Sequence, residues 1–344
     1  MRQKKIGKEH ITIQDVARAA GTSPSSVSRV LTGNANVSDE KRQAILDVIA
    51  KTSYRPNLLA RSLKTRSTQF IGLIINDILN PFYGAIVRGA EDRASESGYA
   101  LILSNTNEQA DLELADIRLL RDKSIDGIIV APSGANSEIL QQCMDDGIAV
   151  VQIDRHSEDL NCPTVILDNY AAAYAATKHL IDQGFQRIGF IGYALGQKSM
   201  VDRDRGYRAA LKDAGLEANR ADVVLVDFTV ESIQSQISDR FSSQDRPQAV
   251  LAGNNRITIA LLSALRDLSL KIPKDIAVVA FDDLPIFTLL APPLTAVAQP
   301  AYEMGRVAVE LLLAQLSGKA QPPYEPVVFL GELVVRASSQ RLTV

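Results

Sequence analysis

The stretch TSPSSVSRVLTG (residues 22–33) decides how the N-terminal part of the chain folds. Ser23 is a favourable N-cap, and Pro24 follows at the first helical position, where its missing N–H costs nothing. The remaining serines and Arg29 fall on the side opposite the apolar residues. We therefore predict a short helix whose outer side carries small hydroxyls and one guanidinium. Its inner side is expected to consist of Val27, Val30 and Leu31.

The preceding segment, TIQDVARAAG, also predicts a short helix. Thr12 and Asp15 have the spacing of a capping box, and Gly21 ends the helix. A third helix begins after Ser38, with acidic residues in its first turn, where the helix dipole favours anions. Two short helices joined by a tight turn and closed by a third form a helix-turn-helix. The third helix is expected to contribute four core residues: Ile45, Leu46, Val48 and Ile49.

The outward hydroxyls fit a surface that approaches nucleic acid. Short side chains at Ser25 and Ser26 allow close contact with base edges and phosphates, and Arg29 can reach either. The alternative is that these serines, with Ser28, are only a helix cap and its solvated first turn. Charge favours the first interpretation, because residues 1–69 carry 13 Lys and Arg against 5 Asp and Glu, whereas the remainder carries 24 against 35.

The segment YRPNLLARSLKT follows this basic region. It predicts a helix of about two turns with Asn57 as a possible cap, which is too short to be stable in water by itself. We expect it to form only against a partner.

The segments TIQDVARAAGTSPSSVSRVLTG, VSDEKRQAIL and YRPNLLARSLKT resemble the headpiece and hinge of the LacI family of bacterial transcription regulators. The resemblance implies a homodimer whose paired hinge helices enter the minor groove, where Leu63 wedges between base pairs and kinks the duplex. The alternative for Leu63 is a linker residue that packs on the body. The predicted DNA-binding residues are Thr12, Ser23, Pro24, Ser25, Ser26, Ser28, Arg29, Asn34, Tyr54, Asn57, Ala60, Arg61, Leu63 and Lys64.

Beyond Gln69, apolar runs alternate with stretches of helix length. This alternation is typical of parallel sheets covered by helices on both faces. The runs expected to form strands are FIGLII, ALILS, GIIVA, AVVQI, TVILD, RIGFIG, DVVLV, QAVLAG and IAVVAF. The predicted fold class is an all-α helix-turn-helix headpiece followed by an α/β core of two doubly wound parallel-sheet lobes, which the resemblance makes periplasmic-binding-protein-like. The predicted ranges are a headpiece at 1–53, a hinge helix and linker at 54–69 and a core at 70–344, with lobe 1 at about 70–160 and 292–325 and lobe 2 at about 161–291 and 326–344.

Several classes of protein do not fit the sequence. No G-x-G-x-x-G follows the first strand, and neither a P-loop nor a G-x-S-x-G motif occurs, so no enzyme is indicated and no cofactor is expected. The three histidines are scattered, and Cys143 and Cys162 form no C-x-x-C, which argues against a metal site or a disulfide framework. No apolar run is long enough to span a membrane, and the basic start lacks the apolar core of a signal peptide, so a cytoplasmic protein is expected.

Ligands of doubly wound sheets bind at the carboxyl ends of the strands, which here points to the cleft between the lobes. Phe82 and Tyr83 can stack on a sugar or a base there, or they can be core contacts at a helix start. Arg203 offers a planar fork to two adjacent oxygens, and Asp282 can accept hydroxyls or cap a turn. The family resemblance implies effector contacts at Phe82, Tyr83, Asp168, Arg203, Phe228, Asn254 and Asp282.

The sequence thus indicates a transcriptional repressor that binds a palindromic double-stranded DNA operator and responds to a small effector. Asn255 stands where many members of the family have Asp, and Lys198 precedes Arg203, which favours a sugar acid among carbohydrates. A purine is the alternative effector, because the aromatic residues also suit a base. A sugar-binding receptor without DNA function and a doubly wound enzyme are the other classes; the basic head and the missing signal peptide disfavour the receptor.

Overall fold

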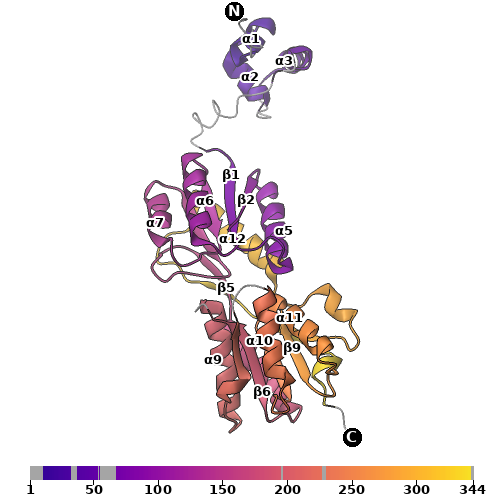
Figure 1. Cartoon of the computed structure of the whole chain (residues 1–344). Helices are drawn as coiled ribbons and strands as arrows, with labels where there is room; N and C mark the ends of the chain where they lie inside the picture. The colour runs from indigo at the N-terminus through magenta and orange to yellow at the C-terminus, as the bar shows by residue number, and fades with distance from the viewer. Residues whose placement is uncertain are drawn as a thin grey trace, which may run out of the picture. The chain divides into compact units, whose positions relative to one another are not determined.

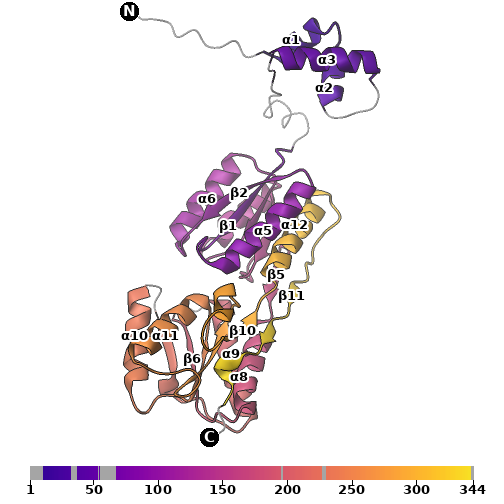
Figure 2. The ribbon, with the colours of Figure 1, turned by 90° about the vertical axis from the view of Figure 1, so that its right-hand side faces the viewer.

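The computed structural model describes residues 11–31, 37–52, 54, 67–194, 197–226 and 230–341. It divides into two compact units, Met1–Thr68 and Gln69–Val344, which we call the head and the core (Figures 1 and 2). The division falls where the basic part of the sequence ends. Head and core are described separately below.

The described part of the head contains the three predicted helices: α1 (Ile13–Ala19), α2 (Pro24–Leu31) and α3 (Asp39–Thr52). The predicted capping box is present, because the Asp15 N–H donates to the Thr12 hydroxyl at 3.3 Å and the Thr12 N–H donates to the Asp15 carboxylate at 3.0 Å. The Ser26 N–H donates to the Ser23 hydroxyl at 3.2 Å, so Ser23 caps α2 as predicted.

The head has its own small core. Val16, Ala17, Val27, Val30 and Ile45 are buried in it, and Val48 and Ile49 pack against it. The prediction that Leu46 belongs to this core is wrong, because its side chain is 43% exposed. The inner face of α3 follows the spacing i, i+3, i+4 from Ile45, and Leu46 lies about 100° away from that face.

The core contains two six-stranded sheets, and all nine predicted strands occur in them. The strand order is β11-β5-β4-β3-β1-β2 in the first sheet and β12-β10-β9-β8-β6-β7 in the second. Every pairing is parallel except that of β12 with β10. The strands are β1 (Phe70–Ile75), β2 (Ala100–Asn105), β3 (Gly127–Val130), β4 (Ala149–Ile153), β5 (Thr164–Leu167), β6 (Ile188–Tyr193), β7 (Val223–Val226), β8 (Ala249–Ala252), β9 (Ala277–Phe281), β10 (Thr295–Ala298), β11 (Val327–Phe329) and β12 (Glu332–Val334).

The two orders are equivalent when β1 is matched to β6 and β4 to β9, so the lobes repeat one topology except at the edge strands, where β11 is parallel and β12 antiparallel to its neighbour. Helices cover both faces of each sheet (Figures 1 and 2). This follows because crossover connections are right-handed, so connections that run toward opposite edges of the sheet place their helices on opposite faces. The helices are α5 (Pro81–Glu96), α6 (Ala110–Asp122), α7 (Ser137–Asp145), α8 (Asn169–Asp182), α9 (Lys198–Asp213), α10 (Val230–Ser242), α11 (Asn255–Asp267) and α12 (Ala301–Leu316), with short 3-10 helices η1 (Arg220–Asp222), η2 (Pro285–Thr288) and η3 (Ala337–Ser339).

The chain passes from one lobe to the other three times, and the predicted positions of these crossings are each a few residues too early. β5 pairs with β4, so lobe 1 continues through Leu167 rather than ending near residue 160. β10 pairs with β9 and therefore belongs to lobe 2, and β11 pairs with β5 and belongs to lobe 1. The sequence did not predict β10, β11 or β12: β11 and β12 have only three residues each, and two of the four residues of β10 are small alanines.

Helices α5 and α12 approach each other closely because two glycines face the partner backbone. A Cβ on Gly89 would lie 1.9 Å from the carbonyl oxygen of Tyr302, and a Cβ on Gly305 would lie 2.1 Å from that of Ile86. These distances are far below van der Waals contact, so only glycine permits this packing. It attaches α12, which follows the second crossing, to lobe 1 (Figure 2).

This packing predicts opposite effects for two substitutions in one helix. Gly89→Ala should lower the free energy of unfolding by about 1–3 kcal/mol, because α5 and α12 must move apart. Gly84→Ala is the matched control, since nothing lies within 4 Å of its added Cβ, and it should raise stability by about 0.5–1 kcal/mol. Urea unfolding followed by circular dichroism measures both. Equal effects would contradict the close approach.

Candidate functional site

The first turn of α2 presents a group of serine hydroxyls. The Ser23 hydroxyl lies 2.7 Å from that of Ser25 and 3.0 Å from that of Ser26. Pro24 and Arg29 are exposed on the same helix, and Ser28 is half-buried. The structure therefore brings the predicted outward residues of α2 together on one surface of small hydroxyls with a guanidinium.

The remaining predicted DNA-binding residues differ in what the structure shows of them. Thr12 caps α1. Tyr54 is half-buried and packs against the core of the head, where burial raises the pKa of its phenol. The residues that lie outside the described part of the chain are Asn34, Asn57, Ala60, Arg61, Leu63 and Lys64.

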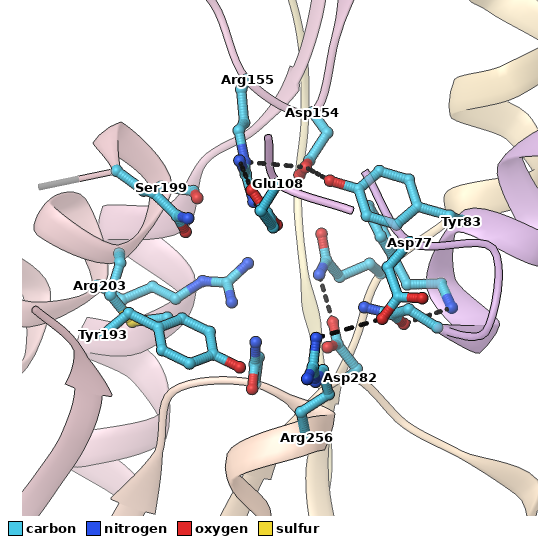
Figure 3. Close-up of a pocket in the computed structure, with 16 residues that line it drawn as sticks. Asp77, Tyr83, Glu108, Asp154, Arg155, Tyr193, Ser199, Arg203, Arg256 and Asp282 are labelled. Atoms are coloured by element: carbon cyan, nitrogen blue, oxygen red, sulfur yellow. Dashed lines mark hydrogen bonds and ion pairs between the residues drawn. The ribbon is translucent and has the colours of Figure 1, made fainter. Parts of the chain in front are cut away.

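A cleft between the two lobes of the core is lined by residues that follow the carboxyl ends of strands in both sheets (Figure 3). Its lining combines carboxylates, guanidiniums, amides and aromatic rings, which is the chemistry of a polar ligand site. The lining residues are Asp77, Asn80, Phe82, Tyr83, Glu108, Asp154, Arg155, Tyr193, Gln197, Ser199, Met200, Arg203, Asn254, Arg256, Asp282 and Gln299.

Lobe 1 contributes a connected polar network to the cleft. The Tyr83 hydroxyl donates to the Asp154 carboxylate at 2.7 Å. Arg155 donates two hydrogen bonds to Glu108, at 2.6 and 2.7 Å. This bidentate geometry fixes the Arg155 guanidinium, so the network is ordered before a ligand enters.

Two aspartates occupy equivalent positions in the lobes. Asp154 directly follows β4 and Asp282 directly follows β9, and both have left-handed backbone conformations, with φ of 65° and 69°. Such a conformation is uncommon outside glycine and concentrates at functional sites. Asp282 accepts hydrogen bonds from the Asn255 N–H at 3.1 Å and from the Gln299 side-chain amide. Each lobe therefore holds one carboxylate at the same edge of its sheet.

Arg203 on α9 is the main cation of lobe 2 in the cleft. Its side chain is buried at 5% exposure and stacks on the Phe281 ring with the guanidinium carbon 3.6 Å from the ring centroid. Its Nε donates to Asn169 Oδ1 at 2.8 Å, and one terminal nitrogen donates to the Gly253 carbonyl at 2.6 Å. Burial lowers the pKa of this guanidinium, and the nearby Asp282 and Asp154 carboxylates oppose that effect. Figure 3 shows it directed into the cleft.

Direct contacts between side chains join the lobes across the cleft. Arg256 lies 3.3 Å from the Asp77 carboxylate, and the Asn255 side-chain amide donates to Asn80 Oδ1 at 2.7 Å. The remaining cavity measures about 50 Å³, well below the roughly 300–1,000 Å³ typical of small-molecule sites. A sugar ring needs more room than this, so its entry requires the lobes to separate or their side chains to turn.

Five of the seven predicted effector residues line the cleft: Phe82, Tyr83, Arg203, Asn254 and Asp282. Asp168 does not; its carboxylate caps α8 by accepting from the Ala171 N–H at 2.8 Å. Phe228 lies outside the described residues.

Much of lobe 1's contribution to the cleft lining was not predicted from the sequence. Asp154 and Arg155 directly follow the strand AVVQI, just as Asp282 follows IAVVAF, so the same strand-end signal was present in both lobes. The other missed residues include Asp77, Asn80, Glu108, Tyr193, Arg256 and Gln299.

Two residues that the sequence offered for recognition of a sugar acid have other partners. Lys198 lies 3.4 Å from Glu158 and does not line the cleft. Asn255 contacts Asn80 and Asp282 and does not line the cleft either. The argument for a sugar acid from Asn255 and Lys198 therefore has no structural basis.

Two negative findings concern the described residues. Among them, no group of three or more His, Cys, Asp and Glu side chains is placed to hold a metal ion. No helix in the same ranges is long and apolar enough to cross a membrane.

Comparison with known proteins gives consistent results for both units. Residues 12–57 match the family model "Bacterial regulatory proteins, lacI family", and residues 177–339 match "Periplasmic binding protein-like domain". The transcriptional regulator RegA of Clostridium saccharobutylicum is 35% identical over 331 residues, covering 95% of this chain and 99% of RegA. The ribose operon repressor of Bacillus subtilis is 34% identical, covering 94% and 98% of the two chains. A structure of the transcriptional regulator CelR in complex with cellobiose is 29% identical, with a TM-score of 0.72 and coverage of 95% and 99%.

The buried carboxylate of Asp154 predicts a pH-dependent stability. Burial raises its pKa, and the Arg155 guanidinium offsets part of the effect. The folded chain therefore binds this proton more tightly than the unfolded chain, and the wild type loses stability as pH rises from the unfolded pKa of about 3.9 through the raised folded pKa. Asp154→Asn keeps the size and tolerates the left-handed backbone but cannot ionise, so its stability relative to the wild type should increase over that range and then level off.

Urea unfolding midpoints between pH 4 and pH 8, with m-values to convert them to free energies, measure this difference. Asp159→Asn, in the exposed loop after β4, is the matched control and should show no comparable rise. A difference between Asp154→Asn and the wild type that is independent of pH would contradict the effect of burial.

Proposed function

The chain belongs to the LacI family of DNA-binding transcriptional regulators, and from that premise we propose that it represses carbohydrate genes and responds to a neutral sugar bound in the cleft of its core. The observation that carries the choice of ligand is the cleft lining, where carboxylates and amides from both lobes surround a small space beside aromatic rings. Carboxylates, amides and guanidiniums together satisfy the alternating donor and acceptor demands of sugar hydroxyls.

The balance of charge favours a neutral ligand over an acidic one. The guanidinium of Arg155 is occupied by Glu108 and that of Arg256 lies against Asp77. Arg203 is enclosed by Asn169, Gly253 and Phe281 and lies near two carboxylates. An added carboxylate or phosphate would have to displace these contacts beside Asp154 and Asp282, at a cost in electrostatic energy. The CelR structure with cellobiose and the ribose operon repressor agree with a sugar as the class of ligand.

For DNA, we propose that α2 enters the major groove of a palindromic operator as part of a homodimer. Its first turn presents the hydroxyls of Ser25 and Ser26, which suit close approach to base edges and phosphates, and Arg29 supplies a bidentate donor. The predicted hinge with Leu63 in the minor groove is part of the same proposal. Repression of bacterial genes places the protein in the cytoplasm, where the DNA lies.

Ligand control follows from differential affinity for two lobe arrangements. The Arg256–Asp77 and Asn255–Asn80 contacts hold the present arrangement, and a sugar that needs more space favours another. The ligand can shift the equilibrium only by the difference between its affinities for the two arrangements. Operator affinity then changes by the same coupling free energy.

Selection of binding sequences from random double-stranded DNA tests the DNA-binding part. We expect enrichment of a palindromic site whose affinity falls steeply with salt concentration, because basic side chains release counterions from the phosphates. Arg29→Ala should weaken binding to the selected duplex by about 1–3 kcal/mol. Arg18→Ala, which removes an exposed guanidinium of α1 paired with Asp15, is the matched control and should have a smaller effect. No enriched sequence, or equal losses in the two variants, would contradict the assignment of α2.

A thermal-shift series tests the ligand class. Ribose, cellobiose, gluconate, glucose 6-phosphate and hypoxanthine are compared, and a neutral sugar at about 100 times its dissociation constant should add about 2.7 kcal/mol of stability. Arg203→Lys keeps the positive charge but loses the planar guanidinium with its parallel N–H donors. It should abolish the thermal shift with sugar and leave operator affinity in the absence of sugar unchanged. Asp168→Asn, away from the cleft lining, should retain the thermal shift. A shift with gluconate, glucose 6-phosphate or hypoxanthine alone would reject a neutral sugar.

A further inference from the structure

Four side chains join the lobes at one side of the cleft, and we call them the clasp. Asp77 and Asn80 lie in lobe 1, in the segment that follows β1, and Asn255 and Arg256 begin α11 in lobe 2. Asp77 faces Arg256 (Figure 3), and Asn80 contacts Asn255. The clasp therefore connects a short segment of each lobe through one ion pair and one hydrogen bond between amides.

The two contacts of the clasp differ in their exposure to water. The side chains of Arg256 and Asp77 are 34% and 19% exposed, so water competes with their ion pair. Asn255 is only 1% exposed, and its side-chain amide donates to Asn80 Oδ1 at 2.7 Å. A buried hydrogen bond is costly to break when one partner is left without a replacement. The amide contact is therefore the stronger half of the clasp.

The surroundings of the Asn255 side chain require a donor at this position. Asn80 Oδ1 also accepts from the Phe82 N–H at 3.0 Å, which caps α5 and fixes the orientation of the Asn80 amide. The Asn255 N–H donates to the Asp282 carboxylate at 3.1 Å, which places a negative charge nearby. A carboxylate of the same shape in place of the Asn255 amide would face an oxygen and add a second charge beside Asp282.

We propose that the side-chain amide of Asn255 holds the empty cleft closed and thereby sets the ratio of closed to open lobe arrangements before any ligand binds. Asn255 does not line the cleft, so its role is conformational and does not depend on touching the ligand. A ligand that binds the open arrangement must break this hydrogen bond, and its apparent affinity is reduced by the fraction of molecules that are closed.

The clasp also bears on the response of the head to the ligand, and this consequence rests on the proposed function. If the lobes and the operator site share one equilibrium, breaking the clasp without a ligand should have the same kind of effect as a ligand that opens the cleft. Operator affinity should then change in the same direction in both cases.

Methionine methyl NMR of the full chain, with the soluble nitroxide TEMPOL as the probe, measures opening of the cleft without a sugar or DNA. The sequence has four methionines. Met200 lines the cleft and is 4% exposed, Met304 is fully buried in the core of lobe 1, and Met144 on α7 is half-buried away from the cleft. TEMPOL broadens the resonances that it can reach, so Met200 reports on the cleft and the other two are references.

Asn255→Asp should make the Met200 methyl accessible to TEMPOL. At pH 8, well above the usual pKa of a carboxyl group, ionisation of the introduced side chain favours the open, hydrated arrangement. Loss of one buried hydrogen bond shifts such a ratio about tenfold, and the broadening of Met200 should rise by about this factor. Broadening of Met304 and Met144 should stay as in the wild type.

Asn80→Asp is the matched control, because it makes the same chemical change on the other side of the same hydrogen bond. Asn80 Oδ1 accepts from both of its partners, and a carboxylate keeps both bonds, so Met200 should remain protected. If Asn255→Asp does not fold, which circular dichroism and the Met304 resonance report, Asn255→Ala removes the same donor without adding a charge.

The outcomes separate the clasp from the proposed function. Unchanged broadening of Met200 in a folded Asn255 variant would overturn the clasp, and an equal rise in Asn80→Asp would overturn the role of the donor. The affinity of Asn255→Asp for the selected operator, measured without sugar, is the second readout. An opened cleft with unchanged operator affinity would support the clasp and contradict the coupling on which the proposed ligand control depends.

Discussion

The chain crosses between the two lobes three times. The relative arrangement of the lobes, and with it the cleft, depends on these crossings. The crossings are bonded to one another, since the Asp168 N–H at the first crossing donates to the Phe329 carbonyl at the third, at 2.8 Å. Gly331 fits between Val297 and Ala172, where a Cβ would lie 2.9 and 3.1 Å from their side chains. Because the crossings are bonded to one another in this way, they can serve as a hinge about which the lobes rotate. A ligand between the lobes is therefore placed where it can control that rotation.

The cleft is built so that its charges compensate one another before a ligand arrives. Within lobe 1, Glu108 holds Arg155. Across the lobes, Arg256 faces Asp77, and these side chains are 34% and 19% exposed. A partly exposed ion pair contributes at most about 1 kcal/mol, so opening this contact costs little. Two lobe arrangements that differ by a few kcal/mol lie within the range that a small molecule can shift.

The sequence predicted most of the fold because its elements are long and strongly patterned. Capping chemistry at Thr12 and Ser23 located two helices of the head, and nine apolar runs located the main strands. The site was predicted less completely. Asp282 was recognised while its counterpart Asp154 was not, although both end a strand, because equivalence of the lobes became visible only in the strand order. Asp168 was predicted to contact the ligand but caps α8 instead. A carboxylate at a helix start gives the same sequence signal whether it caps the helix or contacts a ligand.

The central claim is that the ligand cleft and the DNA-binding head share one equilibrium. The direct measurement is the dissociation constant of the stabilising sugar, determined with and without saturating operator, together with the operator dissociation constant with and without saturating sugar. Coupling requires the two ratios to be equal and different from one, typically by a factor of about 5–150. We predict that operator changes the affinity for sugar by the same factor, and in the same direction, as sugar changes the affinity for operator. Ratios of one in both titrations would contradict the account.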